Sequence, residues 1–223
     1  MSTDWAVTGD QDRDRWNKRY ADVSVDGPSA PPVALERLLA AVSDSVRAAL
    51  PPGPVVDLAG GTGEGARRLA ADLERPAVLT DVSDAALAVA EVRAAGDGEP
   101  LVTARLDLAG ATLAQVNREL ATGAPAGHDL TAVAAWSCLH YLNRPLLASV
   151  ADGLAPGGLF LAAIATVTNQ ERHARPSARF LLERGELRAL VGGDRTELEV
   201  LVDVEEWTPE RTHEAAIVVR RAG

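Results

Sequence analysis

Short apolar runs alternate with amphipathic segments through the middle of the chain. The runs are rich in aliphatic and β-branched residues, which is typical of buried strands, and they cover residues 55–58, 77–80, 101–106, 130–136 and 159–165. The segments between them predict helices, from apolar spacing or capping residues, at residues 66–73, 84–95, 111–121 and 143–154. Strands that alternate strictly with helices predict a parallel, doubly wound α/β sheet with right-handed crossovers.

The C-terminal third follows a different pattern. Residues 198–204 and 215–219 alternate apolar and polar positions with period two, and turn residues around Thr208-Pro209 join them. This pattern predicts an antiparallel hairpin on the sheet edge. Together with the five central strands, the hairpin makes a mostly parallel sheet of seven strands.

The N-terminal part is expected to be helical. Residues 11–20 predict a short polar helix, a Pro/Gly/Ser linker follows at 27–32, and residues 33–50 carry an amphipathic leucine and valine stripe. We therefore divide the chain into a helical lid or cap at residues 1–50 and a sheet unit at residues 51–223, within one structural domain.

Composition excludes several classes of function. The chain is 47% hydrophobic with a net charge of −10, which indicates a globular protein and argues against a nucleic-acid partner bound through its phosphates. No apolar run approaches the ~20 residues of a membrane span, and residues 1–20 lack a signal-peptide core. We therefore expect a cytoplasmic location and no membrane partner, while the oligomeric state stays open. Cys138 is the only cysteine, and the histidines lack ligand spacing, so no metal site is expected.

A glycine-rich turn organises the chain. The strand at residues 55–58 leads directly into Gly60, Gly61 and Gly63, and a helix follows at once. Glycine allows a positive φ and lets a ligand approach the backbone, while a helix N-terminus offers unpaired N–H groups to an anionic group. The turn is therefore expected to bind a nucleotide-like ligand at the carboxyl end of the first strand.

Two cofactors fit this turn. Residues 61–66 match the dinucleotide pattern G-x-G-x-x-G/A, which would suit NAD. Alternatively, Asp57 and the order acidic, Leu, small, Gly, Gly, Thr, Gly resemble the first motif of class I S-adenosylmethionine (SAM)-dependent methyltransferases, with Ala59 in place of the usual first glycine. That resemblance implies a Rossmann-like fold with SAM as the cofactor.

Acidic residues end the second and third strands. Asp81 follows Gly63 by 18 residues and is placed to reach ribose hydroxyls, in NAD as well as in SAM. The alternative is that Asp81 is the N-cap or N′ residue of the next helix. Under the methyltransferase resemblance Asp107 faces the adenine amino group, although it could also be a loop aspartate. The remaining residues expected to line the cofactor are Val82, Leu108 and Trp136.

The segment after the fourth strand carries the candidate base. The triplet Leu139-His140-Tyr141, together with the turn at residues 155–158, resembles small-molecule methyltransferases. His140 could act as a general base, because imidazole titrates near neutral pH. The alternative is a half-buried histidine bonded to the backbone.

A narrower resemblance involves both ends of the chain. The signature Trp16-x-x-Arg19-Tyr20, and residues 175–187 with their Phe-Leu-Leu-x-x-Gly-Glu-Leu pattern, are similar to the methyltransferase group that includes tellurite-resistance enzymes. This resemblance implies a lid of residues 1–32 over the cofactor. Trp16 and Tyr20 would then pack on the cofactor, and Arg19 would reach its carboxylate.

A basic run follows the fifth strand of this acidic chain. Arginine binds oxyanions well, so Arg175 or Arg179 is predicted to hold an anionic acceptor in the crevice. The alternative is that these arginines pair with Glu171, Glu183 and Glu186 on the surface.

We interpret the sequence as a SAM-dependent methyltransferase that acts on a small molecule by in-line displacement. A SAM-binding sensor or partner subunit without turnover is the alternative, and an NAD-binding oxidoreductase is less favoured. The Tyr-x-x-x-Lys dehydrogenase type is excluded because Lys18 is the only lysine and precedes Tyr20, while Tyr141 is followed at the fourth position by Pro145.

Overall fold

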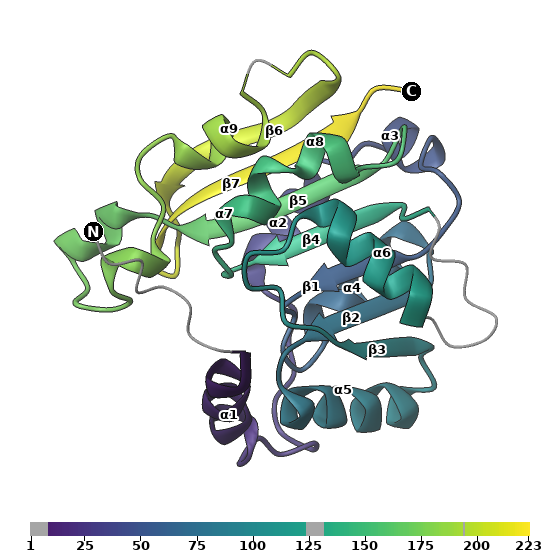
Figure 1. Cartoon of the computed structure of the whole chain (residues 1–223), viewed down its shortest axis with the longest axis vertical. Helices are drawn as coiled ribbons and strands as arrows, with labels where there is room; N and C mark the ends of the chain where they lie inside the picture. Colours follow the sequence, from purple (N-terminus) through teal and green to yellow (C-terminus); the bar gives the residue numbers. More distant parts are fainter. Residues whose placement is uncertain (1–8, 124–131, 194) are drawn as a thin grey trace.

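The computed structural model describes residues 9–123, 132–193 and 195–223. Its centre is a seven-stranded sheet with the order β3-β2-β1-β4-β5-β7-β6 (Figure 1). The strands are β1 Val55–Leu58, β2 Ala77–Asp81, β3 Leu101–Arg105, β4 Ala135–Leu139, β5 Leu159–Ala165, β6 Leu198–Trp207 and β7 His213–Arg221. The first five pair in parallel, and β7 is antiparallel to both β5 and β6. The predicted fold, including the C-terminal hairpin, is therefore confirmed.

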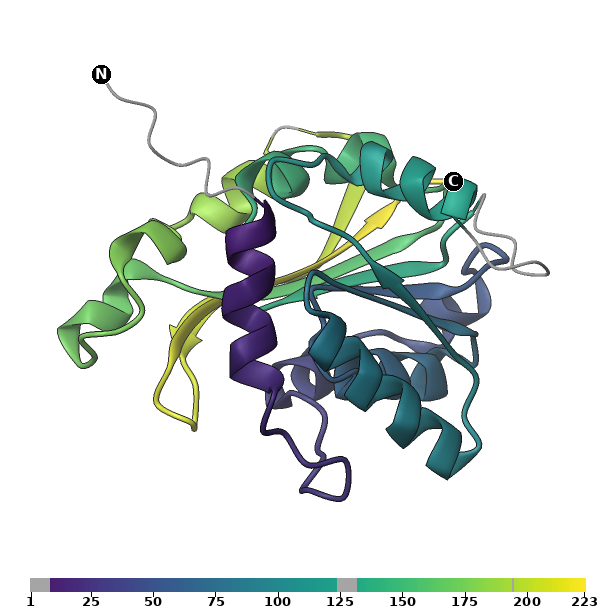
Figure 2. The same cartoon turned by 60° about the horizontal axis from the view of Figure 1, so that its bottom comes forward.

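Helices cover both faces of the sheet, which Figure 2 shows as three layers. The α-helices are α1 Gly9–Tyr20, α2 Val33–Ala40, α3 Asp44–Ala48, α4 Glu64–Leu73, α5 Asp84–Asp97, α6 Leu113–Gly123, α7 Arg144–Ala148, α8 Val150–Gly153 and α9 Glu186–Val191. Two 3-10 turns, Val167–Glu171 and Ala178–Phe180, follow β5. Within the described residues, no helix is long and apolar enough to cross a membrane.

The alternating faces of the strands divide the core in two. Val56 and Trp136 belong to a buried cluster with α6, α7, α8 and α9, whereas Val55 and Ala135 belong to a cluster with α2, α3, α4 and α5. Successive strand residues point to opposite faces, so each strand serves both clusters. Because α2 and α3 pack into this core, α1 and the linker after it are the parts of residues 9–50 that lie outside it.

Three predicted elements differ in extent from the structure. The helix predicted at residues 33–50 is two short helices, because Ser43 accepts a hydrogen bond from the Val46 N–H and starts α3 anew. The helix predicted at 143–154 is likewise divided at Ser149 into α7 and α8. The fourth strand was predicted at 130–136, yet β4 runs from Ala135 to Leu139; residues 130 and 131 lie outside the described residues.

The sheet places a crevice between β1 and β4. From β1 the chain moves to β2 and β3 on one side, and it then crosses to β4 and β5 on the other. Adjacent strands whose following connections run in opposite directions leave a gap at their carboxyl ends, where open α/β sheets bind ligands.

Candidate functional site

A cavity of about 380 Å³ lies at the carboxyl ends of β1 and β4, and residues of α1 form part of its lining. Its volume is within the range of small-molecule sites, which is roughly 300–1,000 Å³. The predicted site residues that line it are Trp16, Arg19, Tyr20, Asp57, Ala59, Gly60, Gly61, Asp81, Val82, Asp107, Leu108 and His140. Lining residues outside the predicted set include Thr62, Glu64 and Gly65 of the glycine loop and Leu139 and Tyr141 beside His140. Those that no sequence motif indicated are Asp12, Ala30, Pro32, Leu106 and Ala109.

The glycine loop wraps around the buried carboxyl group of Asp57. A Cβ atom at Gly60 or Gly65 would collide with that carboxyl group, so both positions require glycine for an intramolecular reason. Asp57 accepts a hydrogen bond from Ser137 Oγ at 2.6 Å. Burial raises the pKa of Asp57 to about 7, and the nearby Asp81 carboxylate acts in the same direction.

Asp81 is anchored by main-chain N–H groups at the end of β2. The Gly61 N–H donates to Oδ2 at 2.9 Å and the Ser83 N–H donates to Oδ1 at 2.8 Å. Burial raises the pKa of Asp81, while these N–H bonds oppose the rise. Ser83, not Asp81, caps α5, because Ser83 Oγ accepts from the Ala86 N–H. The Asp81 carboxyl group lines the cavity and is therefore available as an acceptor there.

Helix α1 covers the cavity with aromatic side chains. Trp16 and Tyr20 stack with ring centroids 6.0 Å apart, and the Arg19 guanidinium carbon lies 5.4 Å from the Trp16 ring centroid. The Tyr20 hydroxyl lies next to Gly61, and burial followed by the Asp81 charge raises the Tyr20 pKa. Asn17 connects the helix to α5, since its Oδ1 accepts from Ser83 Oγ at 2.8 Å.

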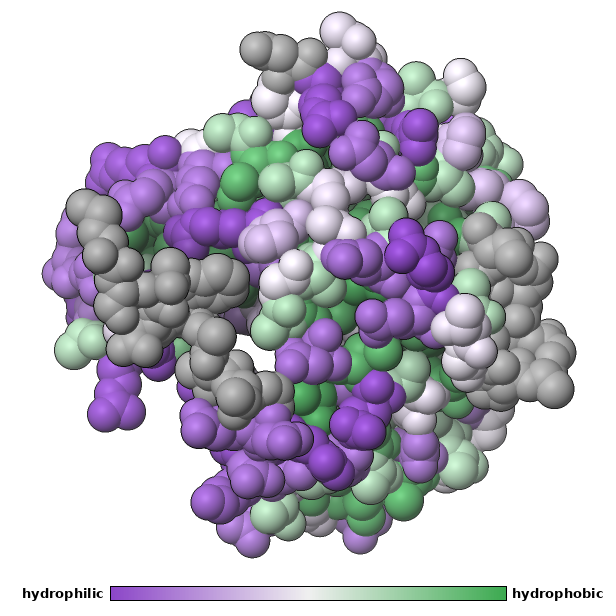
Figure 3. Space-filling view, in the orientation of Figure 1, coloured by the Kyte–Doolittle hydropathy of each residue, from purple (hydrophilic) through white to green (hydrophobic). Residues whose placement is uncertain are grey.

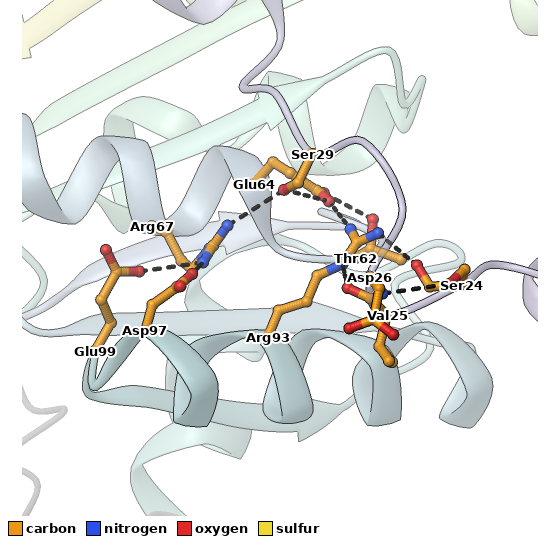
Figure 4. Close-up of polar contacts among 10 residues, drawn as sticks. All are labelled: Ser24, Val25, Asp26, Ser29, Thr62, Glu64, Arg67, Arg93, Asp97 and Glu99. Carbon is orange, nitrogen blue, oxygen red and sulfur yellow. Dashed lines mark hydrogen bonds and ion pairs between the residues drawn. The ribbon is translucent and has the colours of Figure 1, made fainter.

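A buried arginine ties the linker after α1 to the glycine loop (Figure 4). Arg93 on α5 is only 8% exposed. It donates to the carbonyls of Ser24 at 2.9 Å and Val25 at 3.2 Å, and it also pairs with Glu64. Glu64 in turn accepts from Thr62 Oγ1 at 2.7 Å. We call the contacts of Arg93 with residues 24, 25 and 64 the lid latch.

The other two strand ends complete the wall. Asp107 is exposed, and its Oδ1 accepts from the Ala109 N–H at 2.9 Å. His140 is the first residue after β4, and its N–H donates to the Ala163 carbonyl at 2.8 Å. Its ring Nδ1 lies 3.4 Å from a carboxylate oxygen of Glu214 on β7. The imidazole therefore faces a carboxylate, whereas the alternative interpretation of His140 placed it on the backbone.

The predicted site residues Gly63 and Trp136 lie outside the cavity lining. Gly63 precedes α4 with φ of 84°, and a Cβ there would crowd Ala90 and Leu79. Trp136 is fully buried inside β4, between its strand partners Val56 and Phe160. The placement of Trp136 at the cofactor was wrong because β4 continues three residues beyond it.

Arg175 and Arg179 are also displaced from the cavity. After β5 the chain runs outward, and every residue from 171 to 180 is exposed. Figure 3 shows this side of the molecule as mainly hydrophilic. The Arg179 guanidinium lies 4.5 Å from the Phe180 ring centroid. Neither arginine lines the cavity, so their predicted place beside the acceptor was wrong.

Two of the three acidic partners suggested for these arginines pair with other residues. Glu171 pairs with Arg184 at 3.3 Å, and Glu186 pairs with Arg144 at 2.5 Å. Among the residues that the structure describes, no three His, Cys, Asp or Glu side chains gather as they would around a metal ion.

Comparison with known proteins identifies similar solved structures. No family model matches the chain, and a search of curated proteins gave no match. Geranyl diphosphate C-methyltransferase from Streptomyces coelicolor A3(2), solved with geranyl diphosphate and S-adenosyl-L-homocysteine, aligns with a TM-score of 0.59 at 13% identity, over 96% of this chain and 97% of that one. Magnesium protoporphyrin IX methyltransferase from Synechocystis PCC 6803, solved with bound SAH, gives a TM-score of 0.58 at 16% identity, over 96% and 100%.

The same fold also occurs in an enzyme with a different name. The 4+2 cyclase SpnF aligns with a TM-score of 0.54 at 15% identity, over 84% of this chain and 80% of that one. At these identities the similarity establishes architecture, because one fold hosts many reactions. The chain therefore has the Rossmann-like fold of class I SAM-dependent methyltransferases.

Proposed function

We propose that this chain binds SAM in the cavity and transfers its methyl group to a small-molecule acceptor. The observation that carries the proposal is the Asp81 carboxylate, which main-chain N–H groups fix at the end of β2 on the cavity wall. A carboxylate in that position accepts hydrogen bonds from the two hydroxyls of a ribose.

The other cavity residues supply complementary groups. Asp107, at the end of β3, would accept a bond from the adenine amino group. Arg19 would pair with the carboxylate of the methionine part, and Trp16 and Tyr20 would cover the ligand. The Asp81 carboxylate also favours a ligand that carries positive charge.

When bound, SAM supplies an electrophilic methyl group on a sulfonium centre. The chain's own contribution is mainly to position the acceptor in line with that methyl group and to exclude water. Helix α1 performs the second task, because its aromatic residues close the cavity and the lid latch holds the linker against the glycine loop.

The acceptor is a finer part of the proposal. Similar structures include enzymes named for geranyl diphosphate and for magnesium protoporphyrin IX, so the fold accommodates unlike acceptors. The Trp16, Arg19 and Tyr20 signature lines the cavity, which supports the relation to the group with tellurite-resistance enzymes. Because Arg175 and Arg179 lie outside the cavity, the predicted anionic acceptor loses the two side chains that were expected to hold it.

A second function deserves a test. A SAM-binding protein without methyl transfer is favoured by the aromatic lid, because Trp16 and Tyr20 themselves line the cavity.

Transfer of labelled methyl from SAM to fractions of a host lysate distinguishes the two functions. We expect a labelled small molecule that forms only with the enzyme. SAM binding without any labelled product in all fractions would instead support the sensor or partner subunit. Failure to bind SAM would contradict both.

A further inference from the structure

A buried carboxylate on the C-terminal hairpin faces the ring of His140. Glu214 on β7 is 6% exposed, and its Oε1 lies 3.4 Å from His140 Nδ1. His140 lines the cavity and its side chain is 52% exposed, so the ring spans the distance between the buried acid and the cavity. None of the sequence motifs pointed to Glu214.

The backbone holds His140 in this position. Strand pairing sets Glu214 opposite Ala165 on β5, while the His140 N–H donates to Ala163 on the same strand. His140 adopts a φ of +58°, a region that residues with a side chain rarely occupy. Such conformations persist where the surrounding structure enforces them, and they cluster at active sites.

Charged groups other than His140 also act on Glu214. Burial raises the pKa of Glu214, whereas His140 and Arg37 lower it, and Glu210 raises it again. Arg37 on α2 pairs with Glu206 on β6. His140 is the group that lies between Glu214 and the cavity, so an electrostatic effect of Glu214 on the reaction would pass through the imidazole.

We propose that Glu214 is a positioning residue that holds His140 as the base for a protic acceptor, an inference that rests on the proposed function. With its Oε1 3.4 Å from Nδ1, the Glu214 carboxylate favours the neutral tautomer that carries its proton on Nδ1, which leaves the lone pair on Nε2. Nε2 removes the proton from an acceptor hydroxyl or amine as that oxygen or nitrogen forms a bond to the methyl carbon. The carbon–sulfur bond breaks, its electron pair remains on sulfur, and the imidazolium is stabilised by Glu214. The acceptor class is thus a nucleophile whose attacking atom carries a proton.

Ring-nitrogen NMR of the full chain labelled with ¹⁵N-histidine tests the pair directly. The His140 signals are assigned from their loss in His140→Asn. We expect the neutral ring to be the Nδ1–H tautomer in the wild-type protein, and we expect Glu214→Gln to reduce the population of that tautomer. Glu199→Gln, an exposed acid on β6 that pairs with Arg220, is the matched control and should leave the tautomer unchanged.

An Nε2–H tautomer in the wild-type protein would overturn the inference, and so would an unchanged tautomer in a folded Glu214→Gln variant. The wild-type tautomer is read without Glu214→Gln, so it can overturn the inference even where that variant is unstable. Calorimetry with SAM on the same wild-type sample distinguishes a failure of the proposed function from a failure of the Glu214–His140 inference. Absent SAM binding counts against the proposed function, whereas the wrong tautomer with intact SAM binding counts against the Glu214 pair alone.

Discussion

Main-chain groups form much of one side of the cavity, whereas side chains form the other. On the β1 and β2 side, main-chain N–H groups hold Asp81, the glycine loop encloses Asp57, and the lid latch closes around Glu64. On the β4 side, the wall consists of Leu139, His140 and Tyr141, and the exposed segment at 171–180 that follows β5 does not line the cavity. A side built from the main chain suits a fixed cofactor, whereas a side built from side chains is free to follow its acceptor.

Breaking the lid latch gives the largest expected effect. Arg93→Leu leaves Glu64 and two carbonyls without their buried partner, so stability should fall by about 3 kcal/mol and SAM binding should weaken. Arg118→Leu, an exposed position on α6, is the control. Denaturant unfolding and calorimetry measure both effects. Equal stability of the two variants would show that the latch is unimportant.

A pair of glycine substitutions tests the loop around Asp57. Gly65→Ala places a methyl group against the Asp57 carboxyl group and should destabilise the fold by about 1–3 kcal/mol. Gly96→Ala lies in helix α5 with no neighbouring atom within 4 Å, so it should be neutral or stabilising by up to about 1 kcal/mol. Thermal unfolding of both variants checks the contrast. Similar melting temperatures would contradict the role of Gly65.

The raised pKa of Asp57 predicts a dependence of stability on pH. Its pKa is about 7 in the folded chain and near 3.8 when unperturbed, so the folded state binds more protons between these values. Stability should therefore fall as pH rises from about 4 to about 7, by at most about 1.4 kcal/mol per unit from this group, and then level off.

Asp57→Asn should flatten that slope. The amide oxygen can still accept from Ser137, and removal of the buried charge should stabilise the chain at pH 8 by about 1 kcal/mol. Urea unfolding of the wild-type chain and of Asp57→Asn at several pH values between about 4 and about 8 measures this slope. An unchanged slope in the variant would assign the dependence to other groups.

The smallest effect is expected on the exposed segment. The double variant Arg175→Ala with Arg179→Ala should keep its stability within about 0.5 kcal/mol and keep its SAM affinity, because neither side chain lines the cavity. Unfolding and calorimetry check this expectation. A loss of SAM affinity would show that the segment reaches the cofactor side after all.

The sequence predicted the main-chain-built side far better than the other. Asp57, Asp81 and the glycines could be located because strand ends and turn chemistry follow local rules. Trp136 was misplaced because the apolar run around β4 has no alternation that would fix where the strand ends.

Contacts between distant elements account for what the sequence could not provide. Arg93 is an isolated charge in an otherwise apolar helix face, and its burial depends on carbonyls from the linker after α1. Glu214 reaches His140 only through the register between β5 and β7. The arginines around Arg175 make this segment basic, as the sequence shows, but composition does not indicate whether their side chains point into the cavity or away from it.

Calorimetric titration of SAM into the wild-type chain and into Asp81→Ala tests the central claim most directly. Asp97→Ala, an exposed acid on α5 that pairs with Arg67, is the control, and NAD is the competing ligand. We predict that SAM binds the wild-type chain and the control alike, that Asp81→Ala weakens binding about tenfold or more, equivalent to about 1.4 kcal/mol, and that NAD binds less tightly than SAM. Unchanged SAM affinity in folded Asp81→Ala, or tighter binding of NAD than of SAM, would contradict the account.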